Sequence, residues 1–179
     1  MLFVIIPVFN RIEYTIACLE ALNKQSYENF CTVVIDDGSS DNTSYIVKKK
    51  FPNIILLKGD GNLWWSGATN LGIRYAIESG ANHILTLNND LTFDYNYLNN
   101  AMISAKNNVL IGSVLLSNED GTIIDGGSLL NIYNAKKHDL NKGKKIEDIK
   151  NKLVEVNVLP GRGLLIPSKV FDEIGFFEE

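Results

Sequence analysis

Residues 2–8, LFVIIPV, form a continuous apolar run that leads into the polar end of PVFNR, residues 7–11. A run of this kind is typical of a strand that other elements cover on both faces, as in a parallel sheet. It is too short to cross a bilayer, and it lacks the basic flank and the small-residue cleavage site of a signal peptide. We therefore predict a buried β-strand over residues 2–8.

Strands and helices alternate after this run. Ile12, Ile16 and Leu19 recur at helical spacing and predict a helix over residues 11–24, with Asn10 and Glu13 as a loose capping box. Further strands are predicted over residues 31–35, 54–57, 83–87 and 109–116. Further helices are predicted over residues 42–50, 66–79 and 94–106. This order of elements predicts an α/β fold, in which helices flank both faces of a mainly parallel sheet.

The alternation stops after about residue 117. Glycines and short β-like runs over residues 122–125 and 128–133 predict a small antiparallel excursion there. Later strands are predicted over residues 154–159 and 164–167, and a helix begins at about residue 169.

Composition limits the classes of function. The chain has 179 residues, of which 45% are apolar and 21% charged, with a formal net charge of −4. These values are typical of one globular domain, and no basic stretch with interleaved aromatic residues predicts a nucleic-acid partner. Cys18 and Cys31 each lie inside a predicted element, so we expect free buried thiols, a reducing compartment and a cytoplasmic location.

Residues 134–152 contain seven lysines and three acidic residues. A solvated loop is one interpretation of such a charge run. The alternative is a surface for an anionic acceptor or for the face of a membrane.

Polar residues follow the first two strands, where open parallel sheets bind their ligands. PVFNR contains no G-x-G-x-x-G, and the chain contains no G-x-x-x-x-G-K-[ST], so phosphate is held in another way. The second strand ends in Asp36 and Asp37, whose carboxylates repel each other. Turn geometry and helix capping explain Gly38, Ser40 and Asp41 but leave Asp37 unexplained. We predict that Asp37 accepts a hydrogen bond from the imide N–H of uracil or thymine.

Two other segments carry candidate ligands. Asp90 ends the turn Asn88-Asn89-Asp90 after the fourth strand, and it is suited to Mg²⁺ or Mn²⁺, although these residues are also common in turns. Residues 61–70, GNLWWSGATN, contain two tryptophans that either pack on the core or line a sugar or nucleotide site. Asn70 lies in the first turn of the predicted helix and is expected to reach the same crevice.

Taken together and in order, these segments resemble a known family. PVFNR, DDGSSDNT (residues 36–43), GNLWWSGATNLGIRYA (61–76) and LNND (87–90) resemble the nucleotide-binding half of family 2 glycosyltransferases with the GT-A type fold. PGRGLLIP (160–167) and GFFEE (175–179) are similar to the acceptor-side G-x-F-D-E region of that family. The resemblance implies one glycosyltransferase domain over residues 1–179. Its nucleotide-sugar-binding part covers about residues 1–116 and an incomplete acceptor-side part covers about 117–179.

The resemblance also implies roles for individual residues. Pro7 and Phe9 border the nucleoside, Asp37 binds the base, Asn70 lies near the ribose or sugar, and Asp90 matches the last acid of a D-x-D metal motif. The N-x-D form found here is similar to rhamnosyl- and galactofuranosyl-type members. The expected nucleotide-sugar residues are Pro7, Phe9, Asn10, Arg11, Asp37, Gly61, Asn62, Trp65, Gly67, Asn70 and Asn89.

The implied activity is inverting, Mn²⁺- or Mg²⁺-dependent transfer of a hexosyl or deoxyhexosyl group. The donor is a UDP- or dTDP-sugar and the acceptor a saccharide or lipid-linked sugar, as in bacterial polysaccharide biosynthesis at the inner face of the membrane. The family's catalytic base would fall beyond Glu179, so we expect this chain to bind donor but to transfer sugar poorly. The alternatives are a non-catalytic nucleotide-sugar-binding module and a sugar nucleotidyltransferase. The latter normally has a glycine-rich basic loop after the first strand, which PVFNR does not supply.

Overall fold

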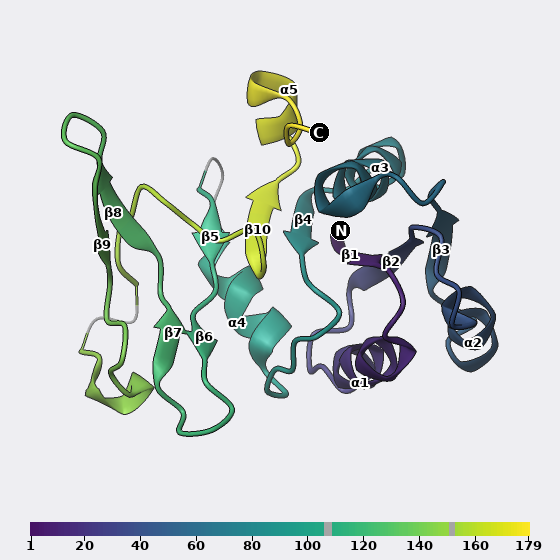
Figure 1. Cartoon of the computed structure of the whole chain (residues 1–179), viewed down its shortest axis with the longest axis horizontal. Helices are drawn as coiled ribbons and strands as arrows, with labels where there is room; N and C mark the ends of the chain where they lie inside the picture. Colours follow the sequence, from purple (N-terminus) through teal and green to yellow (C-terminus); the bar gives the residue numbers. More distant parts are fainter. Residues whose placement is uncertain (106–108, 151–152) are drawn as a thin grey trace. The chain divides into compact units, whose positions relative to one another are not determined.

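Two compact units make up the chain in the computed structural model (Figure 1). The structure describes residues 1–105, 109–150 and 153–179. The first unit contains residues 1–110 and 165–179, and the second contains residues 111–164. The functional division expected at about residue 116 stays a prediction.

A mainly parallel sheet forms the centre of the first unit. Its strands are β1 (Leu2–Val8), β2 (Phe30–Asp36), β3 (Ile55–Lys58), β4 (His83–Thr86) and β10 (Leu164–Pro167). Strand β1 pairs in parallel with β2 and β4, β2 pairs in parallel with β3, and the strand order is β3-β2-β1-β4-β10. Ile5 and Ile6 point to opposite faces of the sheet and are both fully buried. The predicted buried strand over residues 2–8 is therefore confirmed.

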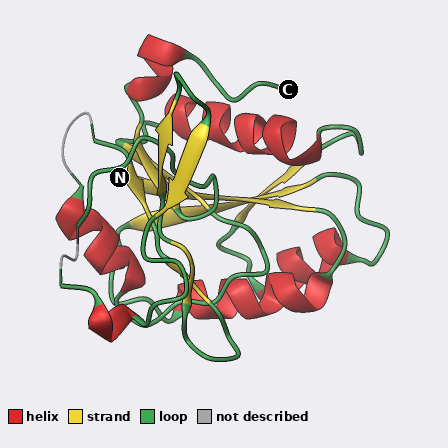
Figure 2. Cartoon of the chain, turned by 60° about the vertical axis from the view of Figure 1, so that its left-hand side comes forward, coloured by secondary structure: helices red, strands yellow, loops and turns green. Residues whose placement is uncertain are grey.

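Helices cover both faces of this sheet (Figures 1 and 2). Helix α3 (Trp64–Glu78) packs on β1 and β2 from one face, whereas α1 (Ile12–Asn23) and α2 (Thr43–Lys50) lie together on the other. A Cβ at Gly72 of α3 would lie 2.6 Å from side-chain atoms of both Ile5 and Ile35, so glycine allows this close approach. The predicted α/β fold is confirmed.

The other helices of the first unit are α4 (Tyr97–Ser104) and α5 (Val170–Ile174). The predicted end of α4 at Lys106 lies outside the described residues.

Helix α1 begins differently from the prediction, and the capping box of Asn10 and Glu13 is wrong. Asn10 and Arg11 both have a left-handed backbone with φ of 58°, and the side chain of Arg11 makes no capping bond. Instead, the N–H of Ile12 donates to Oδ2 of Asp41 at 3.0 Å. The cap thus comes from the loop after β2, which the parallel pairing of β1 and β2 places beside the start of α1.

Short antiparallel pairs form the second unit, which confirms the predicted antiparallel excursion. Strand β6 (Leu115–Leu116) pairs with β7 (Ile123–Asp125), and β8 (Ser128–Asn131) pairs with β9 (Lys136–Asp139). Strand β5 (Ile111–Gly112) and the 3-10 turn η1 (Ile146–Asp148) also belong to this unit.

The single strand predicted over residues 109–116 is wrong. The segment contains two short strands, β5 and β6, separated by Ser113 and Val114. The N–H and the hydroxyl of Ser113 both donate to the carbonyl of Gly163, at 2.9 and 2.7 Å. This contact distant in sequence interrupts the strand.

The strand predicted over residues 154–159 is also wrong, because this segment contributes only the bridge of Val158 to Ser128. Asn157 provides the reason. Its side-chain amide accepts the N–H of Leu130 at 2.7 Å and donates to the carbonyl of Leu130 at 2.9 Å. A side chain therefore occupies the edge of β8 that a further strand would need.

Both cysteines are free, as predicted; Cys18 is buried and Cys31 is half-buried. Within the described ranges, no helix has both the length and the apolar character that a membrane span needs.

Candidate functional site

A cavity of about 310 Å³ lies beyond the carboxyl ends of β1 and β2, at the start of α3. Ligands of open parallel sheets bind in this position. Three segments form its walls: the end of β1, the loop after β2 and the segment that leads into α3. The lining residues are Pro7, Val8, Phe9, Asp37, Gly61, Trp64, Trp65 and Ala68.

The carboxylate of Asp37 organises one wall of this cavity. The residue is only 6% exposed, and its carboxylate accepts three backbone N–H groups. Gly61 donates to Oδ1 at 2.8 Å, while Leu63 and Trp64 each donate to Oδ2 at 3.0 Å. A carboxylate has about four acceptor positions. One position on Oδ1 therefore remains for a ligand.

Two glycines let the loops on either side of Asp37 meet. A Cβ at Gly59 would lie 2.3 Å from Oδ1 of Asp37 and 2.7 Å from Cδ1 of Leu63, so no larger residue fits. Gly38 has a φ of 80°, as its predicted place in the turn requires.

Trp64 has a backbone conformation that bulky residues rarely adopt, with a φ of 54°. Its N–H is bonded to Asp37, and its side chain is 83% exposed. Such conformations persist where neighbouring bonds enforce them, and they cluster at ligand sites. Together with the exposed ring of Phe9, Trp64 presents flat apolar surface to the cavity.

Trp65 connects the cavity to the end of β4. Its indole N–H donates to Oδ1 of Asn88 at 3.0 Å, and its ring meets Phe177 edge-on with 5.4 Å between centroids. The predicted packing of the tryptophans holds for Trp65, and a sugar or nucleotide site at the pair stays a prediction. Trp65 is packed against the protein and also lines the cavity, whereas Trp64 is exposed at the same cavity.

Asn70 binds the C-terminal segment to α3. Its side chain is 1% exposed, and its Nδ2 donates to the carbonyl of Phe177 at 2.8 Å and to Oε1 of Glu179 at 2.9 Å. Its Oδ1 accepts the N–H of Phe177 at 3.1 Å. The guanidinium of Arg74 lies over the ring of Phe176, 4.0 Å from the centroid. Because these partners are protein groups, the predicted proximity of Asn70 to a ribose or sugar stays a prediction.

Asn10 joins the loop after β1 to the loop after β2. Its N–H donates to Oγ of Ser39 at 2.7 Å, and its Oδ1 accepts the N–H of Ser40 at 2.9 Å. Asp36 is 3% exposed and accepts bonds from the N–H of Ser39 and the hydroxyl of Ser44. These bonds hold the rim of the cavity in one conformation.

Asp41 should make the stability of this region depend on pH. Burial alone would raise the pKa of Asp41, but bonds from the Thr43 hydroxyl and from the N–H groups of Ile12 and Thr43 outweigh it and lower the pKa. The stabilisation is therefore complete above about pH 3.9, the ordinary value for an unfolded chain, and is lost as the pH falls through the lower folded value. We expect Asp41→Asn to unfold in less urea than wild type at pH 7, with a smaller difference at pH 3.

Asp60→Asn is the matched control for this measurement. Asp60 likewise accepts a backbone N–H, that of Asn62, but at an exposed position and without the further bonds that Asp41 receives. An equal loss of stability for Asp41→Asn at both pH values would show that the charge of Asp41 is not responsible.

The end of β4 presents an exposed carboxylate, that of Asp90. Asn89 beside it donates from Nδ2 to the hydroxyl of Thr15 at 2.9 Å. Burial and the negative charge of Asp90 raise the pKa of Cys18 to about 12, so this thiol is protonated at neutral pH. Among the residues that the structure describes, no group of three or more His, Cys, Asp or Glu side chains could hold a metal ion.

The structure brings together part of the predicted site. Five of the predicted residues line the cavity: Pro7, Phe9, Asp37, Gly61 and Trp65. Their roles toward a nucleotide sugar stay predictions, as do the roles of the others: Asn10, Arg11, Asn62, Gly67, Asn70, Asn89 and Asp90. Sequence reasoning missed Val8, Trp64 and Ala68 as lining residues. The adjacent tryptophans gave a signal for Trp64, whereas Val8 and Ala68 look like ordinary core residues.

Comparison with known proteins shows the family to which the chain belongs. The model of glycosyl transferase family 2 matches residues 3–175. The chain belongs to this family. A relative, an uncharacterized glycosyltransferase of Rickettsia conorii, is 32% identical over 162 residues, which cover 88% of this chain and 22% of that protein.

Two solved structures share the fold. One is a mannosyltransferase from Pyrobaculum calidifontis in complex with GDP-Man and Mn²⁺. The match covers 99% of this chain and 47% of the mannosyltransferase chain, with a TM-score of 0.68 and 15% sequence identity. TarS residues 1–349 of S. aureus, in complex with UDP-GlcNAc, matches 99% and 48%, with a TM-score of 0.67 and 18% identity. The chain thus spans about half the length of each of these two solved chains.

Proposed function

We propose that the cavity binds the nucleoside diphosphate of a UDP- or dTDP-sugar. The chain then takes part in the transfer, with inversion, of a hexosyl or deoxyhexosyl group to a saccharide or lipid-linked acceptor. The observation that carries this proposal is the cavity around Asp37 at the carboxyl ends of β1 and β2, in a chain of family 2. The ligands of the two solved relatives, GDP-Man and UDP-GlcNAc, support a nucleotide-sugar donor.

The base is recognised by polarity and by stacking. The remaining acceptor position on Oδ1 of Asp37 suits the imide N–H of uracil or thymine, and a charged acceptor strengthens such a bond. Trp64 and Phe9 offer exposed aromatic faces on which a planar base can stack. Val8 and Ala68 add apolar surface to the lining of the cavity.

A divalent cation suits the chemistry of the residues present. Mg²⁺, and by the same chemistry Mn²⁺, is usually held by one or two carboxylates together with substrate phosphates, rather than by a cage of protein ligands. Asp90 supplies one exposed carboxylate at the end of β4, and the donor diphosphate would supply the other oxygens. When bound there, the cation neutralises charge on the leaving diphosphate.

Transfer with inversion is a single displacement. The acceptor hydroxyl oxygen attacks the anomeric carbon as the bond to the diphosphate breaks, and a base takes the hydroxyl proton. No residue described above is assigned as that base. The side chain of Glu179 accepts a bond from Asn70, so its role is to close the C-terminal segment onto α3.

Calorimetric titration with UDP and dTDP, with and without Mn²⁺, tests the donor site. We expect wild type to bind a pyrimidine diphosphate more tightly with Mn²⁺, because the carboxylate of Asp90 and the diphosphate oxygens would together hold the cation. Asp90→Ala should lose about tenfold in affinity with Mn²⁺, as expected for one charge-assisted contact of about 1.4 kcal/mol, and nothing without it.

Asp94→Ala is the matched control, since Asp94 follows in the same loop and its exposed side chain accepts the N–H of Asn96. It should bind as wild type does. Equal affinity of wild type for GDP, UDP and dTDP would contradict recognition of a pyrimidine by Asp37. Absence of binding to all three nucleotides would contradict the donor site itself.

A further inference from the structure

The tip of the β8–β9 hairpin exposes two large apolar side chains. Ile132 and Tyr133 lie in the turn between the strands, with 77% and 95% of their surface exposed. Leu129 on β8 adds another half-exposed apolar group, and the hairpin surface is hollowed along this stretch. Apolar groups that gather at one exposed point mark interaction sites.

Polar groups of the tip turn inward onto the backbone. Oδ1 of Asn131 accepts the N–H of Tyr133 at 3.0 Å, and Oδ1 of Asn134 accepts the N–H of Lys136 at 3.1 Å. The two asparagines therefore stabilise the turn itself. Ile132 and Tyr133 are the side chains that this turn presents to the surroundings.

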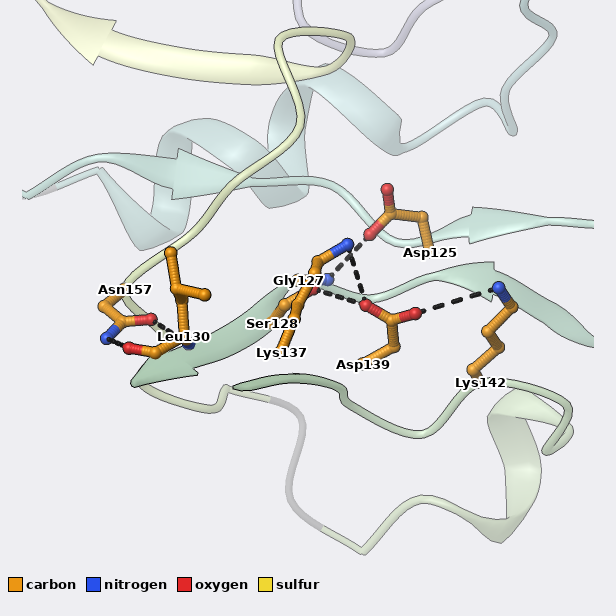
Figure 3. Close-up of polar contacts among 8 residues, drawn as sticks. All are labelled: Asp125, Gly127, Ser128, Leu130, Lys137, Asp139, Lys142 and Asn157. Atoms are coloured by element: carbon orange, nitrogen blue, oxygen red, sulfur yellow. Dashed lines mark hydrogen bonds and ion pairs between the residues drawn. The ribbon is translucent and has the colours of Figure 1, made fainter. Parts of the chain in front are cut away.

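Positive charge is concentrated in the segment that contains the hairpin. Residues 128–145 contain five lysines and one acidic residue, a net charge of +4, whereas the whole chain carries −4. The acidic residue, Asp139, lies at the base of the hairpin, where it accepts the hydroxyl of Ser128 and pairs with Lys137 at 2.9 Å and Lys142 at 3.7 Å (Figure 3). Asp139 is thus neutralised at the base, whereas the exposed Lys136 and Lys137 lie on the half of β9 next to the tip, opposite Asn131 and Leu130.

Side-chain bonds brace the hairpin from outside. Asn157 bonds both backbone groups of Leu130, and Asp125 accepts the N–H of Gly127 at 3.0 Å just before β8 begins (Figure 3). The tip is therefore held on a supported two-stranded arm, which favours an inserting element over a loose loop.

We propose that this tip inserts into the surface of a bilayer that contains anionic lipids. Isoleucine and tyrosine suit the boundary between headgroups and acyl chains, because tyrosine has an apolar ring and a polar hydroxyl. The adjacent lysines attract anionic headgroups, within reach of their flexible side chains. The membrane is favoured over a soluble polyanion, because a polyanion would use the lysines but not Ile132 and Tyr133. This inference does not depend on the donor site, since vesicle binding is measured without nucleotide.

Co-sedimentation with vesicles tests the proposal. Wild type should bind vesicles of phosphatidylcholine with phosphatidylglycerol, and bind vesicles of phosphatidylcholine alone at least about tenfold more weakly. The double variant Ile132→Ser/Tyr133→Ser should lower partitioning into the anionic vesicles about tenfold, because the inserting groups are gone. Lys136→Gln/Lys137→Gln should also lower this partitioning and reduce its dependence on salt.

Matched controls lie on the first unit. Ile103→Ser/Tyr45→Ser removes an isoleucine and a tyrosine that are 74% and 65% exposed, and Lys48→Gln/Lys50→Gln removes two exposed lysines of α2. Both should bind vesicles as wild type does. The proposal is overturned if wild type does not bind the anionic vesicles, or if the Ile132→Ser/Tyr133→Ser variant binds as tightly as wild type. Binding to heparin without binding to vesicles would also overturn it.

Discussion

Asp37→Asn is expected to lower the free energy of unfolding by about 2–4 kcal/mol, because a carboxamide cannot replace this carboxylate. Its oxygens receive N–H groups on both sides, from Gly61 on Oδ1 and from Leu63 and Trp64 on Oδ2. An asparagine has one acceptor oxygen, so in either orientation its NH₂ group faces at least one backbone donor. The residue is buried, and water does not relieve that conflict.

The same change should weaken nucleotide binding by about 100-fold. Without the bonds to Asp37, nucleotide binding would have to order the loop over residues 61–64. The free energy of this ordering lowers the affinity, and each tenfold loss of affinity corresponds to about 1.4 kcal/mol. Urea unfolding and titration with UDP measure the two effects separately. Asp60→Asn is the control, since the exposed Asp60 accepts only the N–H of Asn62 and an asparagine can rotate its oxygen to that donor. A stability of Asp37→Asn equal to that of Asp60→Asn would refute this account of the wall.

Asn70→Asp is expected to release the C-terminal segment from α3, with a loss of about 3 kcal/mol in the free energy of unfolding. The amide nitrogen of Asn70 donates to the carbonyl of Phe177 and to the carboxylate of Glu179. An aspartate would turn a second oxygen toward these two acceptors at a position that is 1% exposed, and would repel Glu179. Phe177 would then lose its place against Trp65.

Hydrogen exchange of the backbone amides reports this release directly. The N–H of Phe177, which donates to Asn70 in wild type, should exchange at least about tenfold faster in the variant. Asn53→Asp, in the exposed loop before β3, adds the same charge without touching the segment and should leave this exchange unchanged. Unaltered exchange at Phe177 in Asn70→Asp would mean that the segment is held by other contacts.

Local sequence pattern was sufficient for the central sheet. Two patterns of neighbouring residues predicted its elements: the apolar run over residues 2–8 and the helical spacing of Ile12, Ile16 and Leu19. The strand and the helix that they predict are both confirmed. The pattern failed over residues 109–116 and 154–159, where the side chains of Ser113 and Asn157 bond backbone groups far along the chain. Neither bond can be predicted from the periodic spacing of apolar residues along the sequence.

The order of motifs predicted where the site lies, since the loops that follow parallel strands meet at one edge of the sheet. Pro7, Asp37, Gly61 and Trp65 line one cavity there, and their roles toward a nucleotide sugar stay predictions. The order of motifs did not predict how Asp37 is bonded, because the N–H partners lie 24–27 residues further on.

The sequence by itself determined the alternation of strands and helices and the loops that carry the site, because apolar runs, helical spacing and turn residues act over a few neighbouring positions. Only the tertiary structure decided what three polar side chains bind. Asp37 binds the loop before α3, Asp41 binds the start of α1, and Asn70 binds the C-terminal segment. Their partners lie 24, 29 and 109 residues away in the sequence. Contacts at such separations form only after strand pairing and helix packing have closed the intervening chain.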